Sequence, residues 1–151
     1  MPSTLLAHAT TVAIGGRGVL LRGASGSGKS DLALRLIDAG ARLVADDQSE
    51  LWRDGDSVLV RAPETIAGLI EVRGLGIVHL DSLPVARLAL VVDLVALDAV
   101  ERLPEQRSEA ILGISIPLVA LAPFEASAPA KLRLALAVAS GDGTFPALSR
   151  Y

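Results

Sequence analysis

The sequence contains no cysteine and very few aromatic residues, and both scarcities limit what the chain can be. Without cysteine, the chain has no disulfide bond and no thiolate ligand for a metal. Aromatic residues account for 3% of the 151 residues, whereas hydrophobic residues account for 51%. We therefore expect a core of leucine, valine, isoleucine and alanine, which suits buried parallel strands and the helices that cover them.

The sequence also lacks an excess of positive charge, and it lacks a long apolar segment without charged residues. The formal net charge of -3 leaves no basic surface of the kind that binds DNA or RNA. The most apolar run, LPVARLALVVDLVALDAV, is interrupted by Arg87, Asp93 and Asp98, so it is poorly suited to span a bilayer. The start, MPSTLLAHAT, has neither the charged beginning nor the long apolar stretch of a signal peptide. We therefore expect a cytoplasmic protein.

The order of the predicted elements indicates a single α/β domain with some antiparallel strands. Its core covers about residues 6–137, and the C-terminal tail is expected to be loose. Apolar patterning and turn residues predict two strands joined by a Gly-Gly turn over 11–23, a helix over 29–40 and a strand over 41–47. They further predict a hairpin over 50–61, a loop or short helix and then a strand over 64–80, strands over 86–95 and 114–121, and a helix over 128–140.

The segment GASGSGKS, residues 23–30, raises a choice between a flexible linker and a phosphate-binding loop. It matches the pattern G-x-x-x-x-G-K-[ST] and lies between a predicted strand and a predicted helix, where a linker is out of place. In such a loop, glycines allow backbone N–H groups to approach phosphate oxygens. Lys29 would reach the β- and γ-phosphates, and the Ser30 hydroxyl would ligate Mg²⁺. The predicted nucleotide-binding residues are Gly23, Ala24, Ser25, Gly26, Ser27, Gly28, Lys29 and Ser30.

Acidic residues follow the predicted strand after this helix and recur further along the chain. Asp46 and Asp47 stand at a strand end, where a carboxylate beside a phosphate loop can bind Mg²⁺ or accept a proton from an attacking hydroxyl. A solvated turn is the alternative, and the neighbouring loop favours the functional interpretation. In IEVRGLGI, Glu71 and Arg73 point to one side of an extended chain. Glu71 either completes a magnesium site or forms an exposed salt bridge with Arg73, and spacing alone does not decide.

Two histidines and an arginine have no distinctive spacing of their own. His8 precedes the first strong strand pattern, and His79 lies in an apolar context. A lone histidine is more often structural than catalytic, so neither is assigned a role from its position. Arg102, in VERLPE, is by itself a charged residue of a loop or helix end.

Taken together, these segments resemble the catalytic domain of HPr kinase/phosphorylase. The resemblance is carried, in the same order, by HATTVAI, GASGSGKSDLALRLI, RLVADD, IEVRGLGI and ERLPE. It implies a P-loop nucleotide-binding α/β domain of the phosphoenolpyruvate carboxykinase-like type, with a mixed sheet and flanking helices. It also implies a kinase that phosphorylates a serine of the phosphocarrier protein HPr with ATP, or with pyrophosphate, and Mg²⁺. Many members of the family also catalyse phosphorolysis, and full-length members assemble as hexamers, so the resemblance implies a homo-oligomer.

The resemblance assigns roles to individual residues. Lys29 resembles the phosphate-binding lysine, and Ser30 and Glu71 resemble the magnesium ligands. The resemblance also gives Asp46 a role in positioning Mg²⁺.

Three further roles concern the chemistry of transfer. Asp47 resembles the proton acceptor for the serine hydroxyl and the proton donor of the reverse reaction. His8 would tune the proton affinity of Asp47, and Arg102 would neutralise charge on the transferred phosphoryl group. These roles for His8 and Arg102 come from the resemblance alone.

Two departures from the family pattern qualify these expectations. The family's N-terminal domain has no counterpart, which suggests a short form. A basic Pro-Gly-Arg-Asn loop, associated with dephosphorylation, is replaced here by LAPFEASAPAKLRLAL, so phosphorolysis is expected to be weak. A small-molecule kinase or carboxykinase-like enzyme on the same scaffold, and a nucleotide-bound regulatory switch, are the alternatives. Loss of the Asp47 carboxylate would stop a kinase but leave a binding switch largely unaffected.

Overall fold

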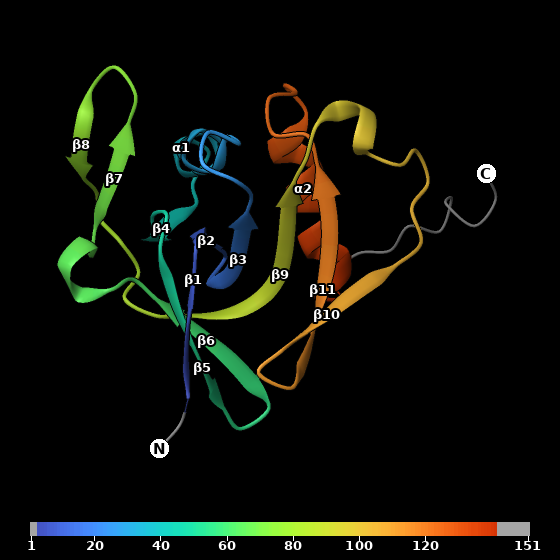
Figure 1. Cartoon of the computed structure of the whole chain (residues 1–151), viewed down its shortest axis with the longest axis horizontal. Helices are drawn as coiled ribbons and strands as arrows, with labels where there is room; N and C mark the ends of the chain where they lie inside the picture. Colours follow the sequence, from blue (N-terminus) through green and yellow to red (C-terminus); the bar gives the residue numbers. More distant parts are fainter. Residues whose placement is uncertain (1–2, 142–151) are drawn as a thin grey trace.

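A curled nine-stranded sheet forms the framework of the computed structural model, which describes residues 3–141 (Figure 1). β9 (Ala86–Leu94) is its central strand, because it has partners along both edges. β3 (Arg17–Arg22) pairs along one edge of it. β6 (Ser57–Arg61) pairs with the beginning of β9 and β11 (Ile114–Leu121) with its end. The other strands of this sheet are β1 (Thr4–Ala7), β2 (Ala9–Ile14), β4 (Arg42–Ala45), β5 (Ser49–Asp54) and β10 (Arg107–Ile111).

β3, β4, β9 and β11 run in the same direction, and their C-terminal ends lie at one edge of the sheet. β3 is parallel to β9, which is parallel to β11. β4 runs the same way, because β4 and β3 are both antiparallel to β2 between them. Figure 1 shows β3, β9 and β11 pointing to the same end of the molecule. Ligands of open α/β sheets bind beyond the carboxyl ends of such strands, which directs attention to this edge.

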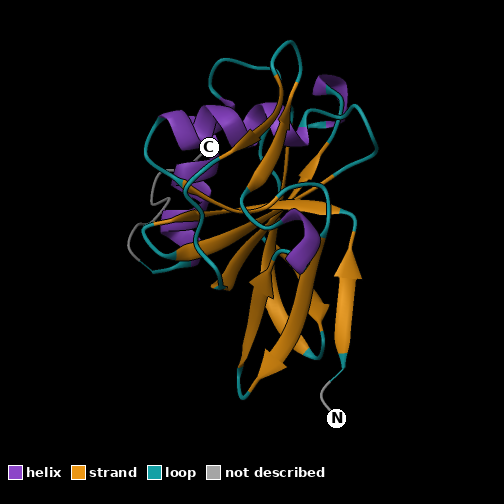
Figure 2. Cartoon of the chain, turned by 90° about the vertical axis from the view of Figure 1, so that its left-hand side faces the viewer, coloured by secondary structure: helices purple, strands orange, loops and turns teal. Residues whose placement is uncertain are grey.

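Two aliphatic cores lie on opposite faces of the sheet. α1 (Lys29–Asp38) and α2 (Ala128–Ala139) pack next to each other over one face, as Figure 2 shows. Leu21 belongs to the core beneath these helices, and Leu20 belongs to the core on the opposite face. β3 is therefore buried on both faces, which explains why its sequence is continuously apolar rather than alternating.

A separate hairpin stands beside α1, formed by β7 (Leu69–Val72) and β8 (Gly76–His79) (Figure 1). The short helix η1 (Glu64–Ile66) precedes it. Of the two alternatives predicted for the start of this region, a loop or a short helix, the structure has the helix. The prediction that a single strand follows within residues 64–80 is wrong, because the chain turns back after Val72 and forms two strands. This turn places Glu71 and Arg73 on a projecting ribbon rather than within the main sheet.

The other predicted strands and helices are present, with three additions. β1 and β10 were not predicted, and a short helix, η2 (Leu97–Ala99), follows β9. Within residues 3–141, no helix is both long enough and apolar enough to cross a membrane. The C-terminal tail for which a loose conformation is predicted falls almost wholly on residues 142–151, outside the described part of the chain.

Candidate active site

The Gly23–Ser30 loop joins the end of β3 to the start of α1, at the edge where the parallel strands end. Gly28 has a φ of 97°, and a Cβ atom added to it would lie 2.9 Å from the ring of Phe124. Gly23 is also required by close approach, because a Cβ atom there would overlap the Ser27 hydroxyl. Larger residues would therefore distort this turn, which accounts for the two fixed glycines of the pattern.

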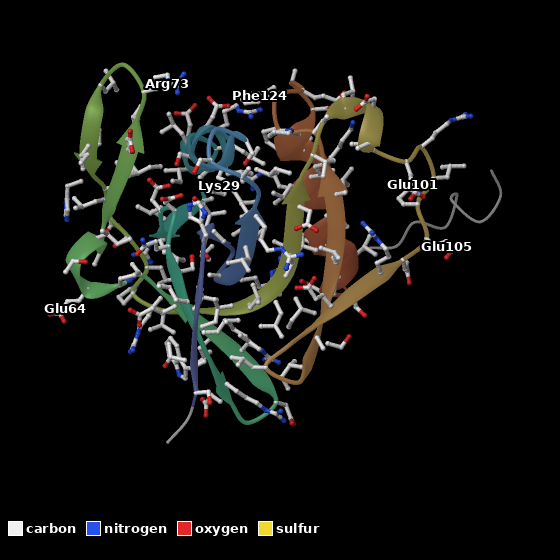
Figure 3. All side chains as sticks on the ribbon, viewed as in Figure 1. Lys29, Glu64, Arg73, Glu101, Glu105 and Phe124 are labelled. Carbon is white, nitrogen blue, oxygen red and sulfur yellow. The ribbon has the colours of Figure 1, made fainter. Side chains whose placement is uncertain are left out.

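Lys29 begins α1 and turns its side chain back toward the loop. Its side chain is only 5% exposed, and Nζ donates hydrogen bonds to the carbonyl oxygens of Gly23 (2.7 Å) and Ala24 (3.1 Å). Nζ also lies 4.0 Å from Oδ1 of Asp47. The loop thus places an ammonium group between its own backbone and Asp47. Figure 3 shows Lys29 near α1.

Asp46 follows β4 and connects three segments that are distant in the sequence. Its Oδ1 accepts hydrogen bonds from the hydroxyls of Ser30 (2.6 Å) and Thr10 (3.2 Å). Its Oδ2 accepts a hydrogen bond from the backbone N–H of Glu71 (3.0 Å). The side chain is 8% exposed, so these donors take the place of water around a buried carboxylate. Asp46 therefore joins β2, α1 and the β7–β8 hairpin.

Asp47 has a different environment from its neighbour. Its backbone is left-handed, with a φ of 64°, and its N–H donates to the Thr10 hydroxyl (3.0 Å). The carboxylate is 57% exposed, and Oδ1 lies 2.8 Å from Nε2 of His8. Since an ionised carboxylate only accepts hydrogen bonds, Nε2 of His8 is the donor. Asp47 thus keeps accessible oxygens, whereas those of Asp46 are occupied.

These groups share one cavity of about 470 Å³. Its walls include Asp46 and Asp47, residues 71–73 of the hairpin, and Ser25, Gly26, Gly28, Lys29 and Ser30 of the loop, whereas Gly23, Ala24 and Ser27 do not line it. Figure 3 shows Arg73 at the outer end of that hairpin. The structure therefore brings together the predicted loop, Lys29, Ser30, Asp46, Asp47 and Glu71, and His8 joins them through Asp47.

The donor chemistry of this cavity fits Mg²⁺. Ser30 and Asp46 place a hydroxyl and a carboxylate oxygen 2.6 Å apart, and Glu71 lines the same cavity. Mg²⁺ prefers such hard oxygen ligands and usually keeps few protein ligands alongside water and phosphate oxygens. Within residues 3–141 there is no cluster of three or more His, Cys, Asp and Glu side chains that could hold a metal by itself. A magnesium ion here would therefore depend on phosphate oxygens for part of its coordination.

Arg102 is not brought to this cavity. It is exposed in the loop between η2 and β10, and it does not line the cavity formed by the other predicted residues. Figure 3 shows its loop neighbours Glu101 and Glu105 at the side of the molecule away from Lys29. The role of Arg102 stays a prediction, and the arrangement of this chain does not support it.

Two residues that contact the site were not predicted from the sequence. Thr10 supports both aspartates, and its hydroxyl within the apolar strand HATTVAI is the signal that could have identified it. Phe124 lies against Gly28, and its position in the segment that replaces the basic family loop was the available indication.

Comparison with known proteins agrees with these observations. Residues 1–134 match the family model described as the HPr Serine kinase C-terminal domain. The HPr kinase/phosphorylase of Geobacillus thermodenitrificans is 40% identical over 126 residues, which cover 76% of this chain and 41% of that protein. That of Halalkalibacterium halodurans is 46% identical over 99 residues, covering 60% of this chain and 32% of that protein. The matched part of this chain thus spans about a third to two fifths of these relatives.

A solved structure has the same fold. The Hpr(Ser) kinase/phosphatase from Coxiella burnetii superposes with a TM-score of 0.76 at 28% sequence identity. The match covers 85% of this chain and 91% of that chain. The mixed α/β architecture with its curled sheet is thus shared with an experimentally determined structure.

Proposed function

We propose, from the premise that the chain belongs to the HPr serine kinase C-terminal domain family, that it transfers the γ-phosphoryl group of ATP to a serine of HPr with Mg²⁺. The observation that carries this proposal is the position of Asp47. Its accessible carboxylate lies between His8 (2.8 Å) and Lys29 (4.0 Å) in the cavity lined by the Gly23–Ser30 loop. A proton acceptor beside a phosphate-binding loop is what phosphoryl transfer to a hydroxyl requires.

The loop would bind the phosphates of the nucleotide. Its backbone N–H groups and the Lys29 ammonium group supply positive charge, and the start of α1 adds its dipole. Ser30 and Glu71 would hold Mg²⁺, which neutralises charge on the phosphate oxygens when bound, and Asp46 would help to position the ion through its hydrogen bond with Ser30. Since phosphoryl transfer depends mostly on positioning and charge neutralisation, these groups suffice for the forward reaction.

Asp47 rather than Asp46 would accept the proton. Both oxygens of Asp46 already accept hydrogen bonds from Ser30, Thr10 and Glu71, whereas Asp47 is exposed. The serine oxygen forms its bond to the γ-phosphorus, its proton passes to Asp47, and the bond to the leaving ADP oxygen breaks. His8, which donates to Asp47, would fix the orientation of that carboxylate and stabilise its charge.

The remaining proposals concern the phosphate donor, the scaffold, the assembly and the reverse reaction. Pyrophosphate is a possible second donor, since the loop would contact only phosphates. The phosphoenolpyruvate carboxykinase-like P-loop type and a homo-oligomeric assembly follow from family membership alone. Residues 122–127 contain no basic residue, which supports weak phosphorolysis of phospho-HPr.

The direct test is to incubate the purified protein with HPr, Mg²⁺ and ATP, and to measure HPr by mass spectrometry. We expect a mass increase of one phosphoryl group located on a serine. Binding of nucleotide without modification of HPr would contradict the proposal and favour a regulatory switch. ATP consumption that depends on a small molecule rather than HPr would favour the small-molecule kinase.

A further inference from the structure

A second cavity, of about 430 Å³, lies beside the Gly23–Ser30 loop. It is formed where β9 and β11 end, by residues 94–97 and 122–125, and Ser27 of the loop closes it on one side. Most of its wall is aliphatic, with Leu94, Ala96, Ala122 and Pro123 among the lining residues. Phe124 lines both this cavity and the one that contains Asp47, so the two cavities adjoin at its ring.

The order of the strands places the two cavities on opposite sides of the loop. The loop follows β3, and the aspartates follow β4, which lies beyond β2 on one side of β3. β9 and β11 lie on the other side of β3. The second cavity is therefore separated from Asp47 by the loop itself.

Phe124 is held in place although its ring is exposed. Arg35 of α1 donates to the carbonyl oxygens of Pro123 and Glu125, on either side of Phe124. Asp31 pairs with Arg35 at 2.9 Å and fixes the guanidinium group. The ring is 69% exposed, yet one edge lies against Gly28. In a chain with so few aromatic residues, a fixed and exposed ring at the junction of two cavities is a surface for a planar ligand.

We propose that this second cavity receives the base of the nucleotide, stacked on Phe124, while the phosphates lie on the Gly23–Ser30 loop. The assignment rests on the proposed function. In phosphoryl transfer the attacking and leaving oxygens lie on opposite sides of the transferred phosphorus. Since the attacking hydroxyl must reach Asp47, the rest of the nucleotide extends to the opposite side, where the second cavity lies. Stacking on an aromatic ring with aliphatic walls suits a base and needs few hydrogen bonds.

Binding of two probes by titration calorimetry separates the base from the phosphates. Phe124→Ala is expected to weaken ADP binding about tenfold, the scale of a lost stacking contact, and to leave pyrophosphate binding unchanged. Phe124→Tyr keeps the ring and should bind ADP as the wild type does. Ala96→Phe, which adds a large side chain in the second cavity, should also weaken ADP alone. Lys29→Ala should weaken both probes, because they share the phosphate site.

The outcomes distinguish failure of this inference from failure of the proposed function. Equal loss of ADP and pyrophosphate binding in Phe124→Ala would mean that the ring only supports the loop, and would overturn the base site. Unchanged ADP binding in both Phe124→Ala and Ala96→Phe would overturn it as well. A raised KM for HPr with unchanged ADP affinity would assign the cavity to the protein substrate instead. Failure of the wild type to bind either probe would overturn the proposed function and this inference together.

Discussion

Asp46 and Asp47 are adjacent in the sequence, but the structure gives their carboxylates separate tasks. Asp46 is buried beneath hydrogen bonds from Ser30, Thr10 and the backbone of Glu71. Asp47 turns outward through a left-handed backbone and contacts His8. One carboxylate thus organises the site, and the other can take part in proton transfer. The sequence pattern DD does not predict this difference between the two aspartates, because the difference arises from neighbours that are distant in the chain.

Replacement of Asp47 tests its role as proton acceptor. Asn tolerates the left-handed backbone of this position, so Asp47→Asn should fold normally and bind ATP. Its amide cannot accept the serine proton, and we expect the rate of HPr phosphorylation to fall by about two orders of magnitude or more. Asp56→Asn, in the exposed turn between β5 and β6, is the matched control and should leave the rate unchanged. Robust phosphorylation of HPr by Asp47→Asn would refute this assignment.

Glu71 offers a test of the magnesium site. Glu71→Gln keeps the backbone N–H that donates to Asp46 but removes one negative charge from the cavity. We therefore expect a higher Mg²⁺ concentration for half-maximal kinase activity, with an unchanged thermal unfolding temperature. Glu64→Gln changes an exposed acid of η1 outside the cavity, and its Mg²⁺ titration should match that of the wild type. An identical titration for Glu71→Gln would show that this carboxylate is only a surface charge.

Among the elements, β3, β9 and β10 are tied together by one arginine just before the loop. Arg22 donates to both carboxylate oxygens of Asp93, at 2.7 and 3.1 Å, and also pairs with Glu109. The hydrogen bonds that Arg22 donates to Asp93 and then to Glu109 raise the pKa of Arg22 further above its ordinary value, so it stays charged throughout the working pH range. The strand that leads into the phosphate loop is thereby anchored to its neighbours.

Removal of this anchor should lower stability. Arg22→Leu leaves Asp93 and Glu109 without their shared cation, and because the three side chains are partly exposed we expect a loss of about 1–2 kcal/mol in the free energy of unfolding. Urea denaturation measures it. Arg42→Leu removes an exposed arginine whose pair with Asp81 is 3.7 Å long, and should cost less than about 0.5 kcal/mol. Equal midpoints for the two variants would show that Arg22 contributes no more than a surface charge.

The segment between β11 and α2 bears on the reverse reaction. Where the family has a basic loop, this chain has Pro123, Phe124 and Glu125, and Lys131 of α2 is paired with Glu125 at 3.0 Å. A negative charge here repels inorganic phosphate, so we expect pyrophosphate release from phospho-HPr to be well below the rate of forward transfer. Glu125→Arg should increase it, and Glu125→Gln should give an intermediate rate. Rapid pyrophosphate release by the wild type would contradict this expectation.

Across the whole molecule, features that depend on neighbouring residues were predictable, and those that depend on topology were not. The Gly23–Ser30 pattern and the buried runs of β3 and β9 identify their own structures locally. β1 and β10 escaped prediction because they are largely exposed and lack an apolar alternation. Arg102 shows the converse, since the family resemblance suggested a role in transfer but the fold places it in an exposed loop outside the cavity.

The candidate site also depends on topology that the sequence does not reveal. Thr10, Ser30, Asp46 and Glu71 meet because β2 lies between β3 and β4 and because the hairpin folds back beside α1. Patterns in the sequence place each residue on an element, but no pattern predicts that Glu71, 25 positions after Asp46, returns to the same carboxylate. The hydroxyl of Thr10 could be recognised only after this geometry was known.

The bond between the Glu71 amide and Asp46 makes a single backbone proton a reporter of the site. Asp46 shares one carboxylate between Ser30 and that amide, so any ligand that draws electron density from Oδ1 changes the bond at Oδ2. In a two-dimensional NMR spectrum, the Glu71 resonance should therefore shift when nucleotide and Mg²⁺ bind, and its exchange with deuterium should change with it. The β7–β8 hairpin would then respond to bound nucleotide, and a protein that contacts the hairpin from outside could distinguish the bound site from the empty one.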